Sequence, residues 1–240
     1  MGMTLAEKIL ARASNKKEIY AGEYVTANID LAMAHDWAAY VIESLKELGI
    51  KKVWDPRKIV IALDHYSPAS SEDVATFHKK IRSFVTKQGI KHFYDVGTGI
   101  CHQLLPEKGH VLPGNLIVGT DSHTTTYGAF GAAGTGIGVT EMTAVFATGR
   151  LWFRVPESIK FDIEGKMPKY IMGKDIILYI AGKYGTDIAQ YKSVEFSGPI
   201  VEKMSVDSRM TVCNMAVEIG AKFGLMEPND AVIQYLSERA

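Results

Sequence analysis

The stretch KIVIALDH, residues 58–65, decides the fold of this chain. Its apolar run Ile59–Leu63 is typical of a strand that is buried on both faces, as in a parallel sheet. The polar pair Asp64-His65 follows directly. Because ligands of open α/β sheets bind beyond the carboxyl ends of the strands, this stretch predicts a buried parallel strand with a site at its end.

Strands and helices alternate on both sides of this run. Thr4 and Glu7 form a capping-box pattern at the first predicted helix, and Gly49 and Gly89 end the next two. The predicted helices cover residues 4–14, 35–48, 71–87, 140–149, 174–182 and 209–220, and the predicted strands cover 24–29, 59–63, 91–96 and 116–119. This alternation predicts an α/β fold in which a mostly parallel sheet lies between layers of helices.

The pattern changes after residue 150. Residues 152–163 alternate apolar and polar side chains and contain Pro156, which indicates a change of sheet or subdomain. We therefore expect two α/β units, residues 1–130 and 131–240, with the change between them at 130–155.

The bulk composition excludes several classes of protein. Hydrophobic residues make up 47% of the 240 residues, and 27 Lys and Arg balance 27 Asp and Glu, so no overall field attracts nucleic acid or anionic lipid. No stretch approaches the ~18 apolar residues of a membrane span, and charges interrupt the N-terminal apolar residues, which favours a soluble cytoplasmic protein. The two cysteines, Cys101 and Cys213, are expected to be reduced thiols that pack in the core.

Polar residues follow three apolar segments. They are Asp64-His65, Cys101-His102 and the run Thr120-Asp121-Ser122-His123. Burying several titratable groups without partners would be costly, so we predict that these side chains pair with one another. A carboxylate fixes the tautomer of an imidazole and raises its basicity, which suits proton transfer during elimination or addition of water.

A glycine-rich segment follows this run. Glycines stand at positions 128, 131, 134, 136 and 138, and their N–H groups would approach a carboxylate or phosphate closely, which predicts an anionic substrate. The segment does not match the dinucleotide fingerprint GxGxxG, because Val139 stands at the last position.

The last predicted helix carries another candidate pair. Asn214 and Glu218 are four residues apart and would share one helix face. The apolar neighbours of Glu218 predict that it is buried with a histidine or a cation as its partner. His78, His92 and His110 lack any motif and are expected at the surface or in loops.

Four segments together resemble the aconitase superfamily, and within it the large subunits of isopropylmalate isomerase and homoaconitase. They are DHYSP (64–68), GICHQ (99–103), GTDSHTTTYGAFGAAGTGIG (119–138) and TVCNMAVEIGA (211–221), and their order and spacing agree over most of the chain. The resemblance implies an aconitase-like fold and a hydro-lyase that moves the hydroxyl group of a small 2-hydroxyacid by dehydration and rehydration. It also implies a [4Fe–4S] cluster whose free iron binds the substrate.

The resemblance assigns roles to residues of this chain. As acid–base and orienting pairs it implies Asp64 with His65, His102 with Asp121, and His123 with Glu218. As residues that bind the substrate or order the site it implies His35, Asp36, Ser122, Thr126 and Asn214. His35 and Thr126 stand where aconitase itself has glutamine and asparagine, so the resemblance favours the isopropylmalate-type enzymes.

The chain also departs from the family pattern. The three cluster-binding cysteines of the family lie in a later domain, and Cys101 and Cys213 do not stand at ligand positions. A small subunit supplies the serine base and the arginines that bind the substrate. The resemblance therefore implies an incomplete enzyme, inactive alone, whose partners are a small subunit and a C-terminal cluster-binding portion. Isopropylmalate, citramalate and homoaconitate all remain open as substrates.

Two other hypotheses stay open at this point. The chain could be a non-catalytic, regulatory or RNA-binding piece, although its balanced charge argues against strong phosphate binding. It could also be a metal hydrolase in which His65, His102 and His123 bind zinc or iron(II).

Overall fold

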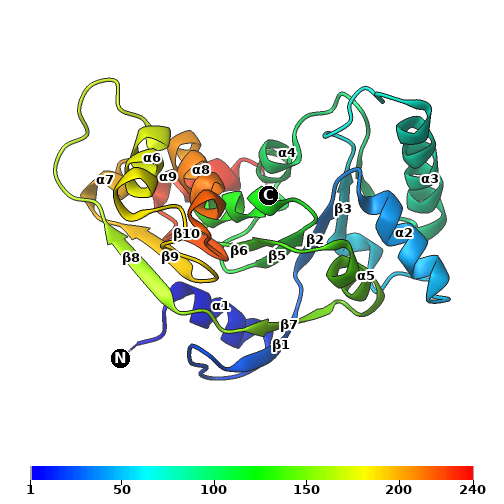
Figure 1. Cartoon of the computed structure of the whole chain (residues 1–240), viewed down its shortest axis with the longest axis horizontal. Coiled ribbons are helices and arrows are strands. Elements are labelled where there is room, and N and C mark those ends of the chain that lie inside the picture. The colour runs from blue at the N-terminus through cyan, green and yellow to red at the C-terminus, as the bar shows by residue number, and fades with distance from the viewer. Residues whose placement is uncertain (1, 240) are drawn as a thin grey trace.

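The structure, a computed structural model, describes residues 2–239. Its centre is a parallel sheet in the order β4-β3-β2-β5-β6 (Figure 1). The strands are β2 (Leu31–Ala34), β3 (Ile59–Ala62), β4 (His92–Tyr94), β5 (Leu116–Gly119) and β6 (Ala133–Gly136). The predicted α/β class and parallel sheet are confirmed.

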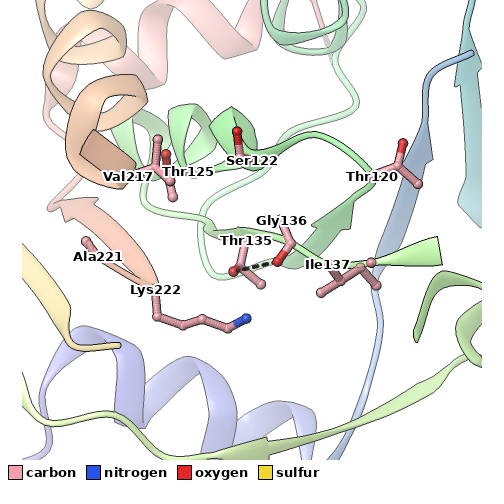
Figure 2. A pocket seen from close by; sticks show the side chains of 10 residues that line it. Thr120, Ser122, Thr125, Thr135, Gly136, Ile137, Val217, Ala221 and Lys222 are labelled. Atoms are coloured by element: carbon pink, nitrogen blue, oxygen red, sulfur yellow. Dashed lines mark hydrogen bonds between the residues drawn. The ribbon is translucent and has the colours of Figure 1, made fainter. Parts of the chain in front are cut away.

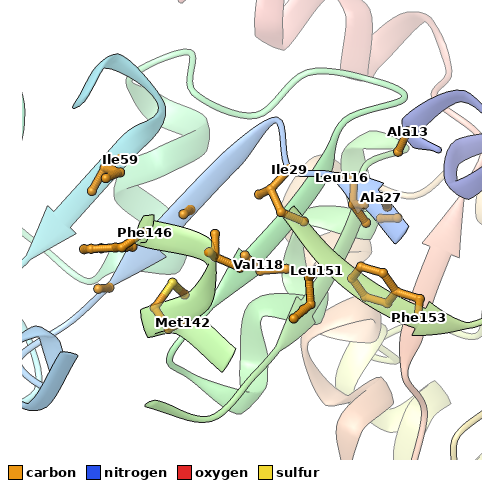
Figure 3. Close-up of a cluster of buried hydrophobic side chains, with 14 of the residues drawn as sticks. Ala13, Ala27, Ile29, Ile59, Leu116, Val118, Met142, Phe146, Leu151 and Phe153 are labelled. Atoms are coloured by element: carbon orange, nitrogen blue, oxygen red, sulfur yellow. The ribbon is translucent and has the colours of Figure 1, made fainter. Parts of the chain in front are cut away.

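Alternate residues of each strand enter two separate cores, one on each face of the sheet. On one face α2 (Ala38–Glu47), α3 (Glu72–Gln88) and α5 (Val139–Thr148) cover the sheet. Figure 3 shows Met142 and Phe146 of α5 in this cluster. On the other face lie α4 (Cys101–Glu107) and the 3₁₀ helix η2 (Ser122–Phe130). The two cores explain why β2, β3 and β5 are apolar at every position.

Two smaller sheets complete the described chain. A parallel sheet in the order β10-β9-β8 packs with helices, and an antiparallel ribbon joins β1 to β7 (Figure 1). Their strands are β1 (Tyr24–Asn28), β7 (Arg150–Arg154), β8 (Ser158–Asp162), β9 (Ser193–Ser197) and β10 (Phe223–Met226). The predicted change of sheet within residues 152–163 is confirmed, because β7 and β8 belong to different sheets. The division at residue 130 stays a prediction, and β6 and α5 beyond it belong to the central layer.

Local capping explains where the helices begin and end. In α1 (Leu5–Ala13) the predicted capping box forms, with Thr4 Oγ1 accepting from the Glu7 N–H at 3.3 Å. Gly49 and Gly89 follow α2 and α3 with φ of 70° and 71°, a left-handed conformation that favours glycine. The remaining helices are η1 (Pro56–Lys58), α6 (Gly173–Tyr184), α7 (Pro199–Glu202), α8 (Val206–Asn214), η3 (Met215–Ile219) and α9 (Asp230–Ser237).

Within residues 2–239, none of the helices has the length and apolarity that crossing a membrane requires.

Sequence analysis missed several elements, among them β2, β6, β9, β10, α7 and α9, and it misjudged one helix. The central strand β2 was missed, because Leu31-Ala32-Met33-Ala34 consists of good helix formers and becomes a strand only by pairing with β3 and β5. The helix predicted over 209–220 ends at Asn214, and the 3₁₀ helix η3 follows it. The tighter 3₁₀ turn rotates Glu218 away from the face of Asn214.

Glycines let η2 lie directly on its neighbours. A Cβ on Gly128 would collide with the carbonyl oxygen of Gly224, and a Cβ on Gly134 would collide with that of Thr124. The missing side chains of Gly128 and Gly134 therefore serve packing, and the expectation that the N–H groups of the glycine segment approach an anion stays a prediction.

We expect Gly128→Ala to lower the free energy of unfolding by about 1–3 kcal/mol, because the added methyl meets backbone that cannot move aside. Gly182 is the matched control, since it lies in α6 with nothing within 4 Å of an added Cβ. Gly182→Ala should stabilise the protein by about 0.5–1 kcal/mol. Urea unfolding of both variants measures the difference, and equal stabilities would contradict the packing described for η2.

Candidate active site

The candidate site lies where the strand order of the central sheet reverses direction. From β2 the chain runs to β3 and β4 on one side, whereas β5 and β6 lie on the other. The carboxyl ends of β2, β3 and β5 lead into His35-Asp36, Asp64-His65 and Thr120-Asp121. Such a switch point opens a crevice between neighbouring strands, and it brings these residues together.

Asp121 is the centre of the hydrogen-bond network. Its Oδ1 lies 2.6 Å from His102 Nε2 and accepts from the His123 N–H at 2.8 Å. Its Oδ2 lies 3.0 Å from His65 Nε2. Burial opposes the charge of Asp121, but the hydrogen bonds from His102 and His65 outweigh it and hold the pKa of the carboxyl well below its usual range.

His65 bridges two carboxylates. Besides Asp121, its ring contacts Asp64, with Nδ1 2.8 Å from Oδ1. Because both nitrogens face carboxylates, both carry protons, and the hydrogen bonds to Asp121 and Asp64 raise the pKa of His65 to about 10. Asp64 also accepts from the Cys101 N–H at 2.7 Å. Burial opposes its charge, yet its hydrogen bonds with His65 and Cys101 lower the pKa of Asp64.

The predicted pair of His123 and Glu218 is in contact. His123 Nε2 lies 3.0 Å from Glu218 Oε1, and Nδ1 lies 3.2 Å from Ser122 Oγ. The prediction that Glu218 is buried is wrong, because its side chain is 55% exposed. Its place in η3 turns the carboxylate toward the surface, where it meets the ring of His123.

His35 and Asp36 lie beneath His65. The ring of His35 stacks on that of His65 with centroids 4.0 Å apart. Burial and the neighbouring His65 lower the pKa of His35 and thus favour its neutral form. Asp36 accepts from the N–H groups of Asp64 at 3.2 Å and His65 at 2.9 Å. Both residues are buried. Through the ring stacking and these hydrogen bonds they support the turn that carries His65.

Sequence reasoning missed one supporting residue, His78. His78 was expected at the surface or in a loop, but it is 2% exposed on α3, and its Nε2 lies 2.6 Å from Asp36 Oδ1. The signal was its place in an apolar stripe with Ile81 and Val85. Thr120 also supports the site, because its Oγ1 accepts from the His35 N–H at 3.1 Å.

His92 and His110 form a separate contact at the edge of the sheet. His92 lies in β4 and is half-buried, so its surface or loop assignment was wrong, whereas His110 lies in the loop after α4 as expected. His110 Nε2 shares a hydrogen bond with the Tyr94 hydroxyl, and its ring packs edge-on against His92. Burial and His92 lower the pKa of His110 to about 4.

Thr126 and Asn214 lie behind His123. Thr126 Oγ1 donates to the His123 carbonyl at 2.6 Å and accepts from Asn214 Nδ2 at 2.9 Å. The Asn214 carbonyl in turn accepts from Thr125 Oγ1 at 3.1 Å. These bonds tie η2 to the end of α8 and fix the position from which His123 faces Glu218.

Exposure divides the network into two layers. The side chains of His65 and His123 are each 35% exposed, so a ligand can reach them. Asp64, His102 and Asp121 are 2%, 12% and 15% exposed and hold the outer residues from behind. Among residues 2–239, His102 Nδ1 is a buried ring nitrogen without a hydrogen-bond partner.

Residues 2–239 do not assemble the histidine metal centre considered above, and their two thiols are not suited to hold a cluster. Within residues 2–239, the groups with ligand-type atoms within 4.8 Å of one another are His35/His65/Asp121 and Asp36/Asp64/His65, so a centre of His65, His102 and His123 is not formed. Cys101 and Cys213 are free thiols as predicted, and both are buried. Burial raises the pKa of both thiols, that of Cys213 to about 12, which disfavours the thiolates that an iron–sulfur cluster requires.

Comparison with known proteins matches nearly the whole chain to one family. A family model described as the aconitase family (aconitate hydratase) matches residues 7–240. The 3-isopropylmalate dehydratase large subunit 1 of Methanopyrus kandleri is 53% identical over 100% of this chain and 57% of the relative. The 3-isopropylmalate dehydratase large subunit of Aquifex aeolicus is 49% identical over 100% of the chain and 56% of the relative.

A relative that is named as a different enzyme is almost as similar. The probable methanogen homoaconitase large subunit of Methanosarcina mazei is 50% identical over 89% of this chain and 55% of the relative. The chain thus spans a little over half the length of the curated relatives that it matches.

We expect the ring of His65 to stay protonated at pH 8, whereas that of His110 is already neutral at pH 6, because their pKa values are about 10 and about 4. Since the pKa of folded His65 exceeds the ordinary 6.5, its contribution to stability is complete below about pH 6.5 and is lost as pH rises through about 10. NMR titration of the ring C–H signals, assigned with His65→Gln, measures both values. A titration of His65 near its ordinary pKa would contradict the double hydrogen bond.

Proposed function

This chain belongs to the aconitase family, and from that premise we propose that it is the N-terminal part of the large subunit of a 3-isopropylmalate dehydratase. The proposed reaction removes water from 2-isopropylmalate to give an alkene and returns water with the hydroxyl on the neighbouring carbon, which yields 3-isopropylmalate. The observation that carries the proposal is the connected network of Asp64, His65, His102, Asp121 and His123 at the strand ends.

We assign proton transfer at the hydroxyl to His123. Its ring is partly exposed, and Glu218 holds Nε2. In the proposed dehydration the carboxylate-paired imidazole donates a proton to the departing hydroxyl, and the serine base expected on the small subunit takes the C–H proton. Rehydration reverses both transfers. Ser122, whose Oγ lies beside the same ring, is the proposed contact for a substrate carboxylate.

His65 has a different proposed role. Its two carboxylate partners keep the ring positively charged at neutral pH, and a third of the side chain is exposed. Asp64 and Asp121 balance that charge from behind, while the exposed edge attracts an anionic substrate. His102 is then a positioning residue, because it holds Asp121 from the buried side.

The other proposed substrate-binding residues act mainly by positioning the side chains of His65 and His123. His35 and Asp36 support the turn of His65, and their direct substrate contact stays a prediction. Thr126 and Asn214 position His123 from behind. We propose that these four residues set the shape of the site.

Homoaconitase is the second candidate function. A relative named as a homoaconitase large subunit is 50% identical to this chain, close to the 53% of the 3-isopropylmalate dehydratase relative. Turnover of the assembled enzyme with isopropylmalate and with homoaconitate, compared as kcat/KM, decides between them. A higher value for homoaconitate would replace the first proposal by the second.

The proposal includes components beyond the described residues. We propose a small subunit that carries the remaining substrate-binding groups, a cluster-binding C-terminal portion of the large subunit, and a cytoplasmic location. A [4Fe–4S] cluster in the complete enzyme would supply a Lewis acid, but neither cysteine of this chain is assigned to it.

In the assembled enzyme we expect His123→Ala to lower kcat by ~10² or more, because a positioned acid–base group is lost. Glu218→Gln should give a related loss, and the double variant should be no worse than either single variant, since the two side chains act as one unit. His92→Ala is the control, because His92 lies at the amino end of β4, away from the strand ends that carry the site. Fully multiplicative losses would show that His123 and Glu218 do not act together.

We expect residues 1–240, purified alone, to take up no [4Fe–4S] cluster and to have no isomerase activity. Only two cysteines are available, both are buried, and neither has a lowered thiol pKa. Anaerobic reconstitution with iron and sulfide, followed by visible absorbance and an isopropylmalate assay, tests this. Circular dichroism verifies that the protein is folded, and a brown protein with turnover would overturn the prediction.

A further inference from the structure

A cavity of about 290 Å³ adjoins the candidate active site. It lies between η2, the loop after β6 and the start of β10, as Figure 2 shows. Thr120 and Ser122, which belong to the network around His35 and His123, line one wall. The cavity therefore continues from the groups that the proposed function uses, and its volume suits a small ligand.

Lys222 is the charged residue that lines this cavity. Figure 2 shows its side chain extended into the space beside Thr135 and Ile137. Within residues 2–239 no carboxylate lies within 4.0 Å of its ammonium group, although Tyr191 presents its ring 5.9 Å away. Glu141, at the start of α5, acts on the lysine only from a greater distance.

The ammonium group of Lys222 is poorly solvated. Burial lowers the pKa of Lys222, and the more distant Glu141 only partly opposes this shift. A partly buried cation without a close counter-ion is unfavourable, so an anion bound beside it would gain free energy on entering.

The cavity depends on glycine at position 136. A Cβ there would lie 2.7 Å from the Asp121 carbonyl oxygen and 2.8 Å from Ser122 Cα. Gly136 thus lets the end of β6 lie against the turn that carries Asp121, which brings the Lys222 cavity next to the network. Gly136 itself lines the cavity.

We infer that Lys222 binds a carboxylate group of the anionic substrate in this cavity. The inference rests on the proposed function, which supplies a hydroxyacid with two carboxylates. Ser122 would hold one carboxylate near His123, and Lys222 would bind the other. Phosphate shares the oxyanion chemistry, and an acidic segment of a covering chain could also occupy the cavity, so the experiments separate these from the substrate.

Binding is measured without turnover. In the assembled enzyme the lysines are reductively methylated with ¹³C, and Lys222→Met identifies the Lys222 signal. Malonate should shift this signal in a saturable way and leave the signal of Lys166, an exposed loop lysine, in place. A shift with inorganic phosphate but not with malonate would overturn the inference. A shift with neither probe would also overturn it, and this is the result expected if another segment fills the cavity.

Kinetics test the link to the substrate. Lys222→Met should raise KM about 10-fold to 100-fold, the loss expected for one charge-assisted hydrogen bond, with a smaller change in kcat. Lys222→Arg should restore most of the affinity, and Lys166→Met should behave like the unchanged enzyme. An unchanged KM in Lys222→Met would contradict substrate binding. A fall in kcat together with a loss of folding stability would also contradict it, because the substitution would then act on the structure. Absence of isomerase activity in the unchanged enzyme would instead refute the proposed function, and the malonate titration would still test the cavity.

Discussion

One carboxylate, that of Asp121, connects the parts of the candidate site. This carboxylate accepts hydrogen bonds from the ring of His102 at the start of α4, the ring of His65 after β3 and the backbone N–H of His123 in η2. A buried carboxylate without donors would be strongly unfavourable, so these segments are held at the positions from which they donate. The geometry of the whole site therefore follows from satisfying a single charge.

Close packing of backbone allows this arrangement. η2 passes so near to β5 and β6 that a side chain on Gly119 would collide with Thr124, and one on Gly136 would collide with the turn at Asp121. A second layer then fixes the outer histidines, because Asp36 holds the turn of His65 and Asn214 holds Thr126 behind His123. Rigid support of this kind is what positions acid–base groups accurately.

Much of this was predictable, because local patterns carried it. The apolar run Ile59–Leu63 indicated a parallel strand, and polar residues directly after strands indicated paired groups at one edge of the sheet. What depended on distant partners was not predictable. His78 lies in a visible apolar stripe, but its partner Asp36 is 42 residues away. Glu218 became exposed because α8 gives way to a 3₁₀ helix, a change that the composition of the segment does not signal.

The exposure of the outer groups explains why a second surface is part of the proposed enzyme. The side chains of His65 and His123 are about one third exposed, and that of Glu218 is 55% exposed. In water the electrostatic effect of such groups on a substrate is weak, and it strengthens when solvent is excluded. The chain has no net charge, so the attraction of an anion must come from local cations such as His65 and Lys222. Covering this face would strengthen both effects at once, which is the physical reason for assigning a small subunit to it.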